Sequence, residues 1–297
     1  MSIQYRISNI LMNVTSDCEY QIERMKLFEE AASDNFNNND LTINIKQKNE
    51  LQIKGNPIIT DERTEWNLNP TDNSYYTYIF SKLVQKNVAT LDIDTDWKKA
   101  EINYIDNTGK MINSVDVGKF YTFHMVGVFF RYSILNYLGI VVHASSIKFN
   151  EQGIVFTAPA GTGKSTHTRL WEKYLSDQVC VLNDDTPVIR IINGKPFLFG
   201  TPWSGSTDKC MNKSVPLSAI VIIERDDKNS IRELSLMETN SRLMPRFFFP
   251  YFDKALMDKA VMIYEKIISQ VPVYLLKCTP EKEAMDVAYK FIIKDLN

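Results

Sequence analysis

Ala158-Pro-Ala-Gly161-Thr-Gly163-Lys164-Ser165-Thr166 is the stretch that decides the fold of this chain. It follows the apolar run at residues 154–156 and precedes a helical pattern that includes Leu170 and Trp171. A strand, a glycine-containing loop and a helix, in that order, form the context of a phosphate-binding loop. The usual pattern has a glycine six positions before the lysine, where this chain has Ala158. The part that wraps the phosphates is complete, so we predict a nucleotide-binding loop.

Each residue type in this loop has a physical role. Glycines let backbone N–H groups turn toward phosphate oxygens, and the helix N-terminus adds partial positive charge. The Lys164 ammonium adds a full charge, and the Ser165 hydroxyl can bind Mg²⁺. The alternative, a glycine turn followed by chance by Lys-Ser, does not account for the strand and the helix around it. The residues predicted to bind the nucleotide are Ala160, Gly161, Thr162, Gly163, Lys164, Ser165 and Thr166.

Composition limits the class of protein. A chain of 297 residues suggests one large domain or two smaller ones, and its formal net charge of -2 argues against a dedicated nucleic-acid binder. The cysteines at positions 18, 180, 210 and 278 have no CxxC spacing, which indicates reduced thiols rather than a zinc site or a disulfide framework. No signal peptide is recognisable. We therefore expect a cytoplasmic protein that binds neither nucleic acid nor membranes.

The first 118 residues are typical of a β-rich domain. Residues 42–48 and 50–54 alternate apolar and polar side chains as half-buried strands do, and residues 102–112 have the pattern of a hairpin. The polar tract at residues 33–40 is expected to be a loop. No catalytic constellation is recognisable there, and the domain serves either recognition or packing.

Residues 119–297 are expected to form the catalytic domain. Its predicted first helix, residues 120–138, contains His124, Arg131 and Asn136, which favours burial over a membrane span, and Gly139 is expected to end it with a left-handed φ. The other predictions are strands at 140–147, 179–182, 217–223 and 271–276, helices at 238–249, 253–270 and 281–296, a hydroxyl-rich loop at 200–209, and hairpins turning at 150–153 and at Asn193-Gly194. A hairpin directly before the phosphate loop means that this sheet cannot be purely parallel.

Asp184 and Asp185 end an apolar strand about twenty residues after Lys164. One carboxylate can hold Mg²⁺ while the other accepts the proton of an attacking hydroxyl. The alternative is a polar turn that caps the strand. Together with the phosphate loop, the pair points to phosphoryl transfer.

Several other residues have a functional and a structural interpretation. His143 lies between apolar neighbours on the predicted strand and is either a core residue or part of the site. His167 either faces solvent or caps the first turn of the loop helix, and His124 is expected to pack among aromatic rings. Lys209 and Arg225 are candidate cations for a phosphate or simply solvated charges.

Four segments together resemble the catalytic domain of the HPr serine kinase/phosphorylase family: His143-Ala-Ser, Gly161-Thr-Gly-Lys-Ser-Thr-His167-Thr, Leu182-Asn-Asp184-Asp185 and Gly200-Thr-Pro-Trp203-Ser-Gly205. The resemblance is closer to the branch of stand-alone homologues, some of which sit beside peptide-modification genes and include lasso-peptide tailoring kinases. It covers residues 119–297, and the N-terminal third carries none of it.

The resemblance implies an α/β fold shared with phosphoenolpyruvate carboxykinase, in which a mixed sheet carries the nucleotide loop. It implies ATP·Mg²⁺ as donor and a serine hydroxyl as acceptor. It places His143 near the transferred phosphate and makes Asp184 and Asp185 the base and the metal partner, with Lys164 and Ser165 in their loop roles. Ser165 and Asp184 are then the expected Mg²⁺ ligands.

Two departures from the family pattern restrict what is carried over. Thr166 stands where the bifunctional members have glutamate, which leaves the reverse phosphorolysis in doubt, and their docking signature for the carrier protein is absent. The leading hypothesis is an ATP-dependent kinase that phosphorylates a serine of a peptide or protein. The alternatives are a kinase of free serine or another small metabolite, and a module that binds ATP without transferring its phosphate.

Overall fold

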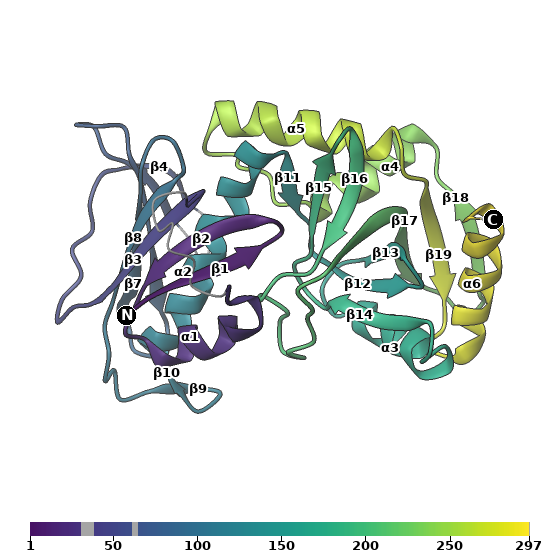
Figure 1. The fold of residues 1–297 in the computed structure, drawn as a ribbon, viewed down its shortest axis with the longest axis horizontal. Helices are drawn as coiled ribbons and strands as arrows, with labels where there is room; N and C mark the ends of the chain where they lie inside the picture. Colours follow the sequence, from purple (N-terminus) through teal and green to yellow (C-terminus); the bar gives the residue numbers. More distant parts are fainter. Residues whose placement is uncertain (31–38, 61–64, 297) are drawn as a thin grey trace. The chain divides into compact units, whose positions relative to one another are not determined.

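The computed structural model describes residues 1–30, 39–60 and 65–296, and the chain divides into two compact units (Figure 1). The first comprises Met1–Asn136 with Tyr251–Lys254, and the second comprises Tyr137–Pro250 with Ala255–Asn297. Both are mixed α/β units whose main sheets combine parallel and antiparallel pairs. Among the described residues, no helix is long and apolar enough to cross a membrane.

The main sheet of the first unit has eight strands in the order β1-β2-β3-β8-β7-β6-β5-β4, and a second sheet pairs β9 with β10. The strands are β1 (Ser2–Ile7), β2 (Ile10–Thr15), β3 (Leu41–Gln47), β4 (Asn56–Thr60), β5 (Glu65–Leu68), β6 (Tyr75–Ser81), β7 (Lys86–Ile93), β8 (Lys99–Tyr104), β9 (Met111–Ile112) and β10 (Val115–Asp116). The helices are α1 (Glu19–Met25), α2 (Val117–Ser133) and the short 3-10 segments Lys26–Phe28 and Ile134–Tyr137.

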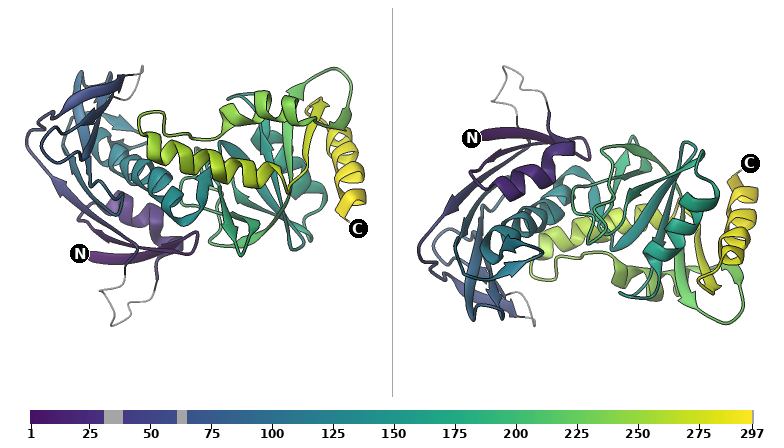
Figure 2. Two further views of the ribbon diagram at one scale, coloured as in Figure 1. Left: turned by 90° about the horizontal axis from the view of Figure 1, so that it is seen from above. Right: turned by 90° about the horizontal axis from the view of Figure 1, so that it is seen from below.

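Helix α2 packs against β7 and β8, and the sheet curves around it (Figure 2). Asp116 caps its start by accepting a hydrogen bond of 2.9 Å from the Gly118 N–H. Gly118 is required because a Cβ there would lie 1.7 Å from the Ile105 carbonyl oxygen. The boundary between the two units falls after Asn136. Helix α2, which was expected to begin the second domain, thus belongs to the first unit.

Several local predictions for the first unit were wrong. Residues 51–54 form no strand, and residues 102–112 form no hairpin, because β8 pairs with β3 and β7 while β9 pairs with β10. Alternation alone does not make a strand where no neighbouring strand completes its hydrogen bonds. The loop expected at residues 33–40 lies mostly outside the described residues.

The second unit contains a nine-stranded sheet with the path β11-β15-β16-β17-β13-β12-β14, and β19 joins β17 to β18. Its strands are β11 (Gly139–Val141), β12 (Ala144–Phe149), β13 (Gln152–Thr157), β14 (Val179–Asn183), β15 (Val188–Ile192), β16 (Lys195–Phe199), β17 (Ser214–Arg225), β18 (Ser230–Glu233) and β19 (Val273–Cys278). Its helices are α3 (Lys164–Tyr174), α4 (Leu236–Leu243), α5 (Lys254–Ile268), α6 (Lys282–Leu296) and the 3-10 segment Met244–Arg246.

The sheet of the second unit is mixed, as predicted. Strand β17 runs parallel to β13 and β19, whereas β12 is antiparallel to both β13 and β14. The hairpin before the phosphate loop and the Asn193-Gly194 turn are confirmed, the latter with positive φ angles of 50° and 78°. Helices α3 and α6 cover one face, where Trp171 and Met285 are buried in one apolar cluster with β12, β13 and β14.

Three boundary predictions for the second unit were wrong. The strand expected at 140–147 is two strands, β11 and β12, which pair with different neighbours and leave His143 between them. The left-handed residue after the helical segment is Leu138, with a φ of 57°, rather than Gly139, which already begins β11. The helix expected at 238–249 ends earlier, as α4 and a 3-10 turn.

Candidate functional site

The loop between β13 and α3 has the open backbone that a phosphate requires. Gly161 and Gly163 have φ angles of +75° and +123°, and no described atom comes within 4 Å of the place where a Cβ would stand on either glycine. Positive φ is accessible to glycine at low cost and turns successive N–H groups toward one side. Ala160, Gly161 and Thr166 are exposed, whereas Thr162, Gly163 and Ser165 are partly buried.

Lys164 lies at the floor of this loop. Its side chain is buried, and its Nζ donates a hydrogen bond of 3.1 Å to the Ala158 carbonyl oxygen. Burial lowers the pKa of Lys164, nearby Asp185 and Asp184 oppose that effect, and the Arg246 guanidinium adds to it. The structure therefore places two cations and both aspartates in one electrostatic environment.

A chain of hydroxyl groups joins the loop helix to Asp184. The Ser145 Oγ donates to the Asp184 carboxylate at 2.6 Å and lies 2.9 Å from the Thr168 Oγ1 on α3. Each hydroxyl has one proton, and the short charge-assisted bond uses that of Ser145. Thr168 is then the donor to Ser145, and its 3.2 Å contact with the Ser165 carbonyl oxygen is secondary. Asp184 is only 7% exposed and is held in place by this chain.

Asp185 has a more open position than Asp184, although the two are adjacent. Its side chain is 37% exposed, and its Oδ1 lies 3.5 Å from the His143 Nε2. The break between β11 and β12 makes this approach possible, because the His143 N–H bonds to the Arg246 carbonyl oxygen and the Ala144 N–H bonds to that of Asp185. The open carboxylate and its imidazole partner form the part of the site that a hydroxyl group can reach.

Asn183 fixes the turn that carries both aspartates. Its Oδ1 accepts hydrogen bonds from the N–H groups of Asp185 (2.9 Å) and Thr186 (2.7 Å). Its amide donates to the carbonyl oxygens of Thr201 (2.9 Å) and Trp203 (3.2 Å) in the loop at 200–209. The loop at 200–209 therefore stabilises the Asp184-Asp185 turn through its hydrogen bonds with Asn183.

The residues present suit a magnesium ion that also binds nucleotide phosphates. No group of three or more His, Cys, Asp or Glu side chains in the described ranges could hold a metal ion alone. Mg²⁺ commonly uses one or two protein oxygens and completes its shell with phosphates and water. The Asp184 carboxylate and the Ser165 hydroxyl are hard oxygen donors, and the hydrogen bonds that join Thr168 of α3 through Ser145 to Asp184 connect their elements.

Two pockets flank the phosphate loop. The first, of about 370 Å³, lies beside Gly163, Thr166 and Leu170 and reaches Ile223 and Pro280. Leu170, Ile223 and Pro280 give it an apolar wall, which suits a nucleoside. The second, of about 590 Å³, lies on the Ala160 and Gly161 side of the loop and is lined by arginines.

The other candidate residues have mainly structural contacts. His167 does not face solvent, contrary to one interpretation of the sequence: it is 3% exposed and accepts a hydrogen bond of 3.1 Å from the Trp171 indole N–H. Lys209 forms an ion pair with Glu172. Arg225 donates to the carbonyl oxygens of Thr162 (3.1 Å) and Gly161, so it supports the phosphate loop.

His124 lies among aromatic rings, as expected, with ring centroids 4.5 Å from Phe120 and 5.9 Å from Phe123. Sequence reasoning missed the parts played by Ser145, Thr168, Asn183 and Arg246. The first three lie beside recognised motifs, in His143-Ala-Ser, in the loop helix and directly before Asp184, so their positions carried a signal. Arg246 had none, because only the fold brings it to Lys164.

No protein-family profile matches this chain, and no curated protein matches it either. Among solved structures, the chain is similar to the HPr(Ser) kinase/phosphatase from Coxiella burnetii. The identity is 10% and the TM-score 0.32, and the match covers 53% of this chain and 99% of the other. A TM-score this low supports no argument about function.

Proposed function

We propose that this protein is an ATP-dependent kinase that transfers the γ-phosphoryl group to a serine hydroxyl of a peptide or protein. The observation that carries the proposal is the meeting of a glycine loop and its buried Lys164 with Asp184, Asp185 and Arg246. Phosphoryl transfer needs cations around the phosphate and a carboxylate for the acceptor proton. Nucleotide binding alone does not require a second, open carboxylate paired with a histidine.

The two pockets suggest the orientation of the nucleotide. The apolar pocket beside Thr166 and Leu170 suits the ribose and base, because the N-terminus of α3 then faces the phosphates. The γ-phosphoryl group in this orientation lies toward Lys164 and the two aspartates. Bound Mg²⁺ would be held by Asp184 and Ser165 and would neutralise charge on the phosphate oxygens.

The transfer step follows from the different positions of the two carboxylates. Asp185 accepts the proton of the serine hydroxyl, and His143 holds and orients its Oδ1. The serine oxygen forms a bond to the γ-phosphorus while the bond from that phosphorus to the β–γ bridging oxygen breaks. ADP leaves with the bonding electron pair, and Lys164 and Arg246 stabilise the charge that develops.

The test measures nucleotide binding and transfer separately. We expect Lys164→Ala to abolish displacement of a fluorescent ATP analogue by ATP. Asp185→Asn should keep ATP binding and lower transfer by about a hundredfold, the scale of losing a positioned base. Lys195→Gln, which removes an exposed lysine from the start of β16, is the control and should change neither.

The acceptors are a panel of serine-containing peptides and free L-serine, with products identified by mass spectrometry. Phosphorylation of L-serine without any peptide product would show that the acceptor is a small molecule. ATP binding with no transfer to any acceptor would contradict the kinase assignment. Equal transfer by the wild type and Asp185→Asn would contradict the role of that carboxylate.

A further inference from the structure

The pocket of about 590 Å³ on the Ala160 side of the phosphate loop is strongly basic. Its charged lining consists of Arg225, Arg242, Arg246 and Glu224, which leaves a surplus of two positive charges. Its volume is in the range of pockets that hold small ligands or a few residues of a peptide. The apolar pocket already suits the nucleoside, so this one is available for another anionic group.

Arg246 connects this pocket with the predicted site of transfer. Its Nε is buried and has no hydrogen-bond partner among the described residues, and the residue lines the pocket. Its carbonyl oxygen accepts from the His143 N–H at 2.8 Å, and the next residue, Phe247, bridges to Val142. The Arg246 backbone therefore adjoins His143, and its guanidinium lies near enough to the phosphate loop to lower the pKa of Lys164.

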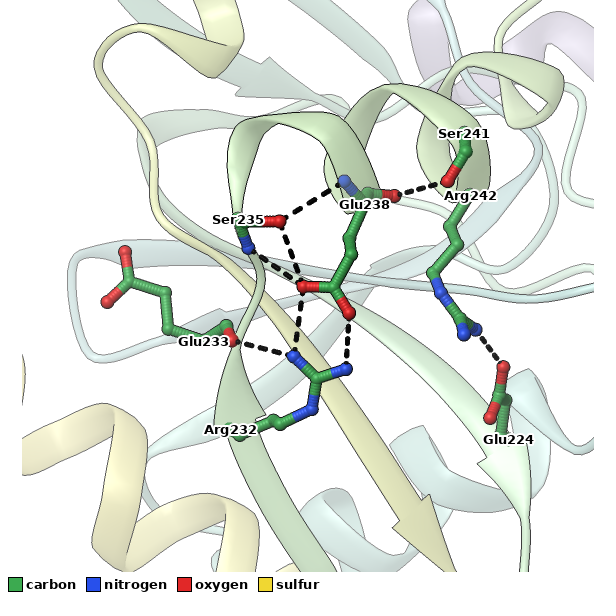
Figure 3. Close-up of polar contacts among 7 residues, drawn as sticks. All are labelled: Glu224, Arg232, Glu233, Ser235, Glu238, Ser241 and Arg242. Carbon is green, nitrogen blue, oxygen red and sulfur yellow. Dashed lines mark hydrogen bonds and ion pairs between the residues drawn. The ribbon is translucent and has the colours of Figure 1, made fainter.

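The second arginine of the pocket, Arg242, lies on α4, whose N-terminus is capped by side-chain contacts (Figure 3). Ser235 and Glu238 form a capping box, and Arg232 binds the Glu238 carboxylate through two contacts of 2.6 Å and 3.1 Å. The helix is thereby fixed at its first turn, and it presents Arg242 toward Glu224 of β17. Both members of this ion pair are more than a third exposed, so the pair is open to a competing anion.

The third arginine closes the pocket on the side of the phosphate loop. Arg225 binds the carbonyl oxygens of Gly161 and Thr162 and so places its positive charge at the loop itself. A guanidinium keeps its charge at any physiological pH. The three arginines thus form a basic wall beside Gly161 and Thr162 of the phosphate loop.

We propose that this pocket binds acidic side chains that flank the acceptor serine, so that the substrate is a peptide segment with carboxylates next to its hydroxyl. The proposal rests on the kinase function proposed above. Guanidinium groups bind carboxylates through paired hydrogen bonds, and Arg242 can exchange Glu224 for a substrate carboxylate. The acidic flank holds the serine, and the hydroxyl then reaches Asp185. No covalent step beyond the transfer described above is involved.

The test uses fluorescence anisotropy on the full chain, saturated with a non-hydrolysable ATP analogue and Mg²⁺. The probes are three labelled nonapeptides with a central serine, flanked by glutamate, glutamine or lysine. The acidic peptide should bind about tenfold more tightly than the neutral one, the scale of two charge-assisted contacts, and the basic peptide should bind most weakly.

Variants of the pocket should change the affinity for the acidic peptide in opposite directions. Arg242→Gln should weaken it about fivefold, whereas Glu224→Gln, which removes the competing carboxylate, should strengthen it by about threefold. Lys195→Gln removes one exposed positive charge from the start of β16 and should have no effect. Phosphorylation of the acidic peptide by the wild type should exceed that of the neutral one.

The results separate this proposal from the kinase function itself. Failure to bind the ATP analogue contradicts the kinase function. Normal ATP binding with equal affinity for acidic and neutral peptides contradicts only the acidic specificity. If Arg242→Gln and Lys195→Gln weakened the affinity for the acidic peptide equally, the preference would be non-specific charge attraction, and the proposed role of the pocket would be wrong. Displacement of the acidic peptide by equimolar L-malate would show a small hydroxy acid as the ligand and overturn the peptide assignment.

Discussion

The Ser145 hydroxyl donates a hydrogen bond of 2.6 Å to the Asp184 carboxylate, while Ser146, the next residue of the same strand, binds the Asn183 carbonyl oxygen at 3.0 Å. Successive side chains of a strand point to opposite faces. Ser145 therefore binds a carboxylate of the candidate site, whereas the Ser146 hydroxyl binds only a backbone carbonyl oxygen. Both are fully buried, which makes them a matched pair for mutation.

Ser145→Ala should lower ATP-dependent transfer by about ten- to a hundredfold, the scale of one hydrogen bond to a charged group. Ser145→Thr keeps the hydroxyl and should recover most of the activity. The measurement is initial rate against Mg²⁺ concentration, because a displaced Asp184 should also raise the Mg²⁺ concentration needed for half-maximal rate. Ser146→Ala is the control, and equal effects of the two alanine variants would exclude a specific role for Ser145.

His143 and Asp185 should act as one unit in the transfer step. Their side chains are 3.5 Å apart, and in the proposed transfer Asp185 takes the proton while His143 orients the Asp185 carboxylate. His143→Asn and Asp185→Asn should each lower kcat by about a hundredfold without changing the affinity for ATP. The double variant should be no worse than the more damaged single variant, because groups that act together are not additive. Additive losses would mean independent roles.

Asn183 should be the most sensitive polar residue of the second unit for stability. Replacing it with alanine removes the side-chain partner of the Asp185 and Thr186 N–H groups and of the Thr201 carbonyl oxygen, whereas the Trp203 carbonyl oxygen keeps its 2.6 Å bond from the Thr186 hydroxyl. We expect Asn183→Ala to lower the free energy of unfolding by about 2–4 kcal/mol, since each buried unsatisfied group costs about 1–3 kcal/mol and water relieves part of it. Urea titration followed by tryptophan fluorescence measures the change.

Asn183→Asp is the informative companion variant. It keeps the acceptor oxygens for the N–H groups of Asp185 and Thr186 but places a carboxylate against the carbonyl oxygens of Thr201 and Trp203. It should be at least as destabilising as alanine at pH 7, because an unpaired buried charge is unfavourable. A stability close to that of the wild type would mean that the donor side of Asn183 contributes little.

Local patterns were sufficient for the strand, loop and helix around Lys164 and for the Asn193-Gly194 hairpin. In both cases the deciding residues are adjacent in the sequence. These same residues adopt the positive φ angles on which the loop and the turn depend. The deciding residues are likewise adjacent for β14, which ends at Asn183 directly before Asp184. Such features could be predicted because no distant segment is needed to specify them.

The remaining features depend on distant segments. The strand expected at 140–147 breaks at His143 because the N–H groups of Val142 and His143 bond to the carbonyl oxygens of Pro187 and Arg246. Neither partner is recognisable from the sequence around His143. Arg246 reaches Lys164 for the same reason, so the basic pocket could not be predicted from the phosphate-loop motif.

His167 should make the second unit less stable in mild acid. Burial lowers its pKa to about 4, below the usual value of 6.5, and its Nε2 must stay unprotonated to accept from the Trp171 N–H. Between these two values the unfolded chain binds more protons than the folded one, so the free energy of unfolding falls as the pH is lowered from about 6.5 to about 4. The full contribution of this histidine is about 3 kcal/mol.

His167→Gln keeps an acceptor for Trp171 but does not titrate in this range. Urea unfolding of the wild type and the variant at pH 7.5, 6.0 and 5.0 should give curves whose difference changes steadily in favour of the variant as the pH falls. Carboxylates titrate in both proteins, so the difference isolates His167. A constant difference across the three pH values would mean that the folded protein binds a proton at His167 as readily as the unfolded chain, and that the buried histidine is not held in its neutral form.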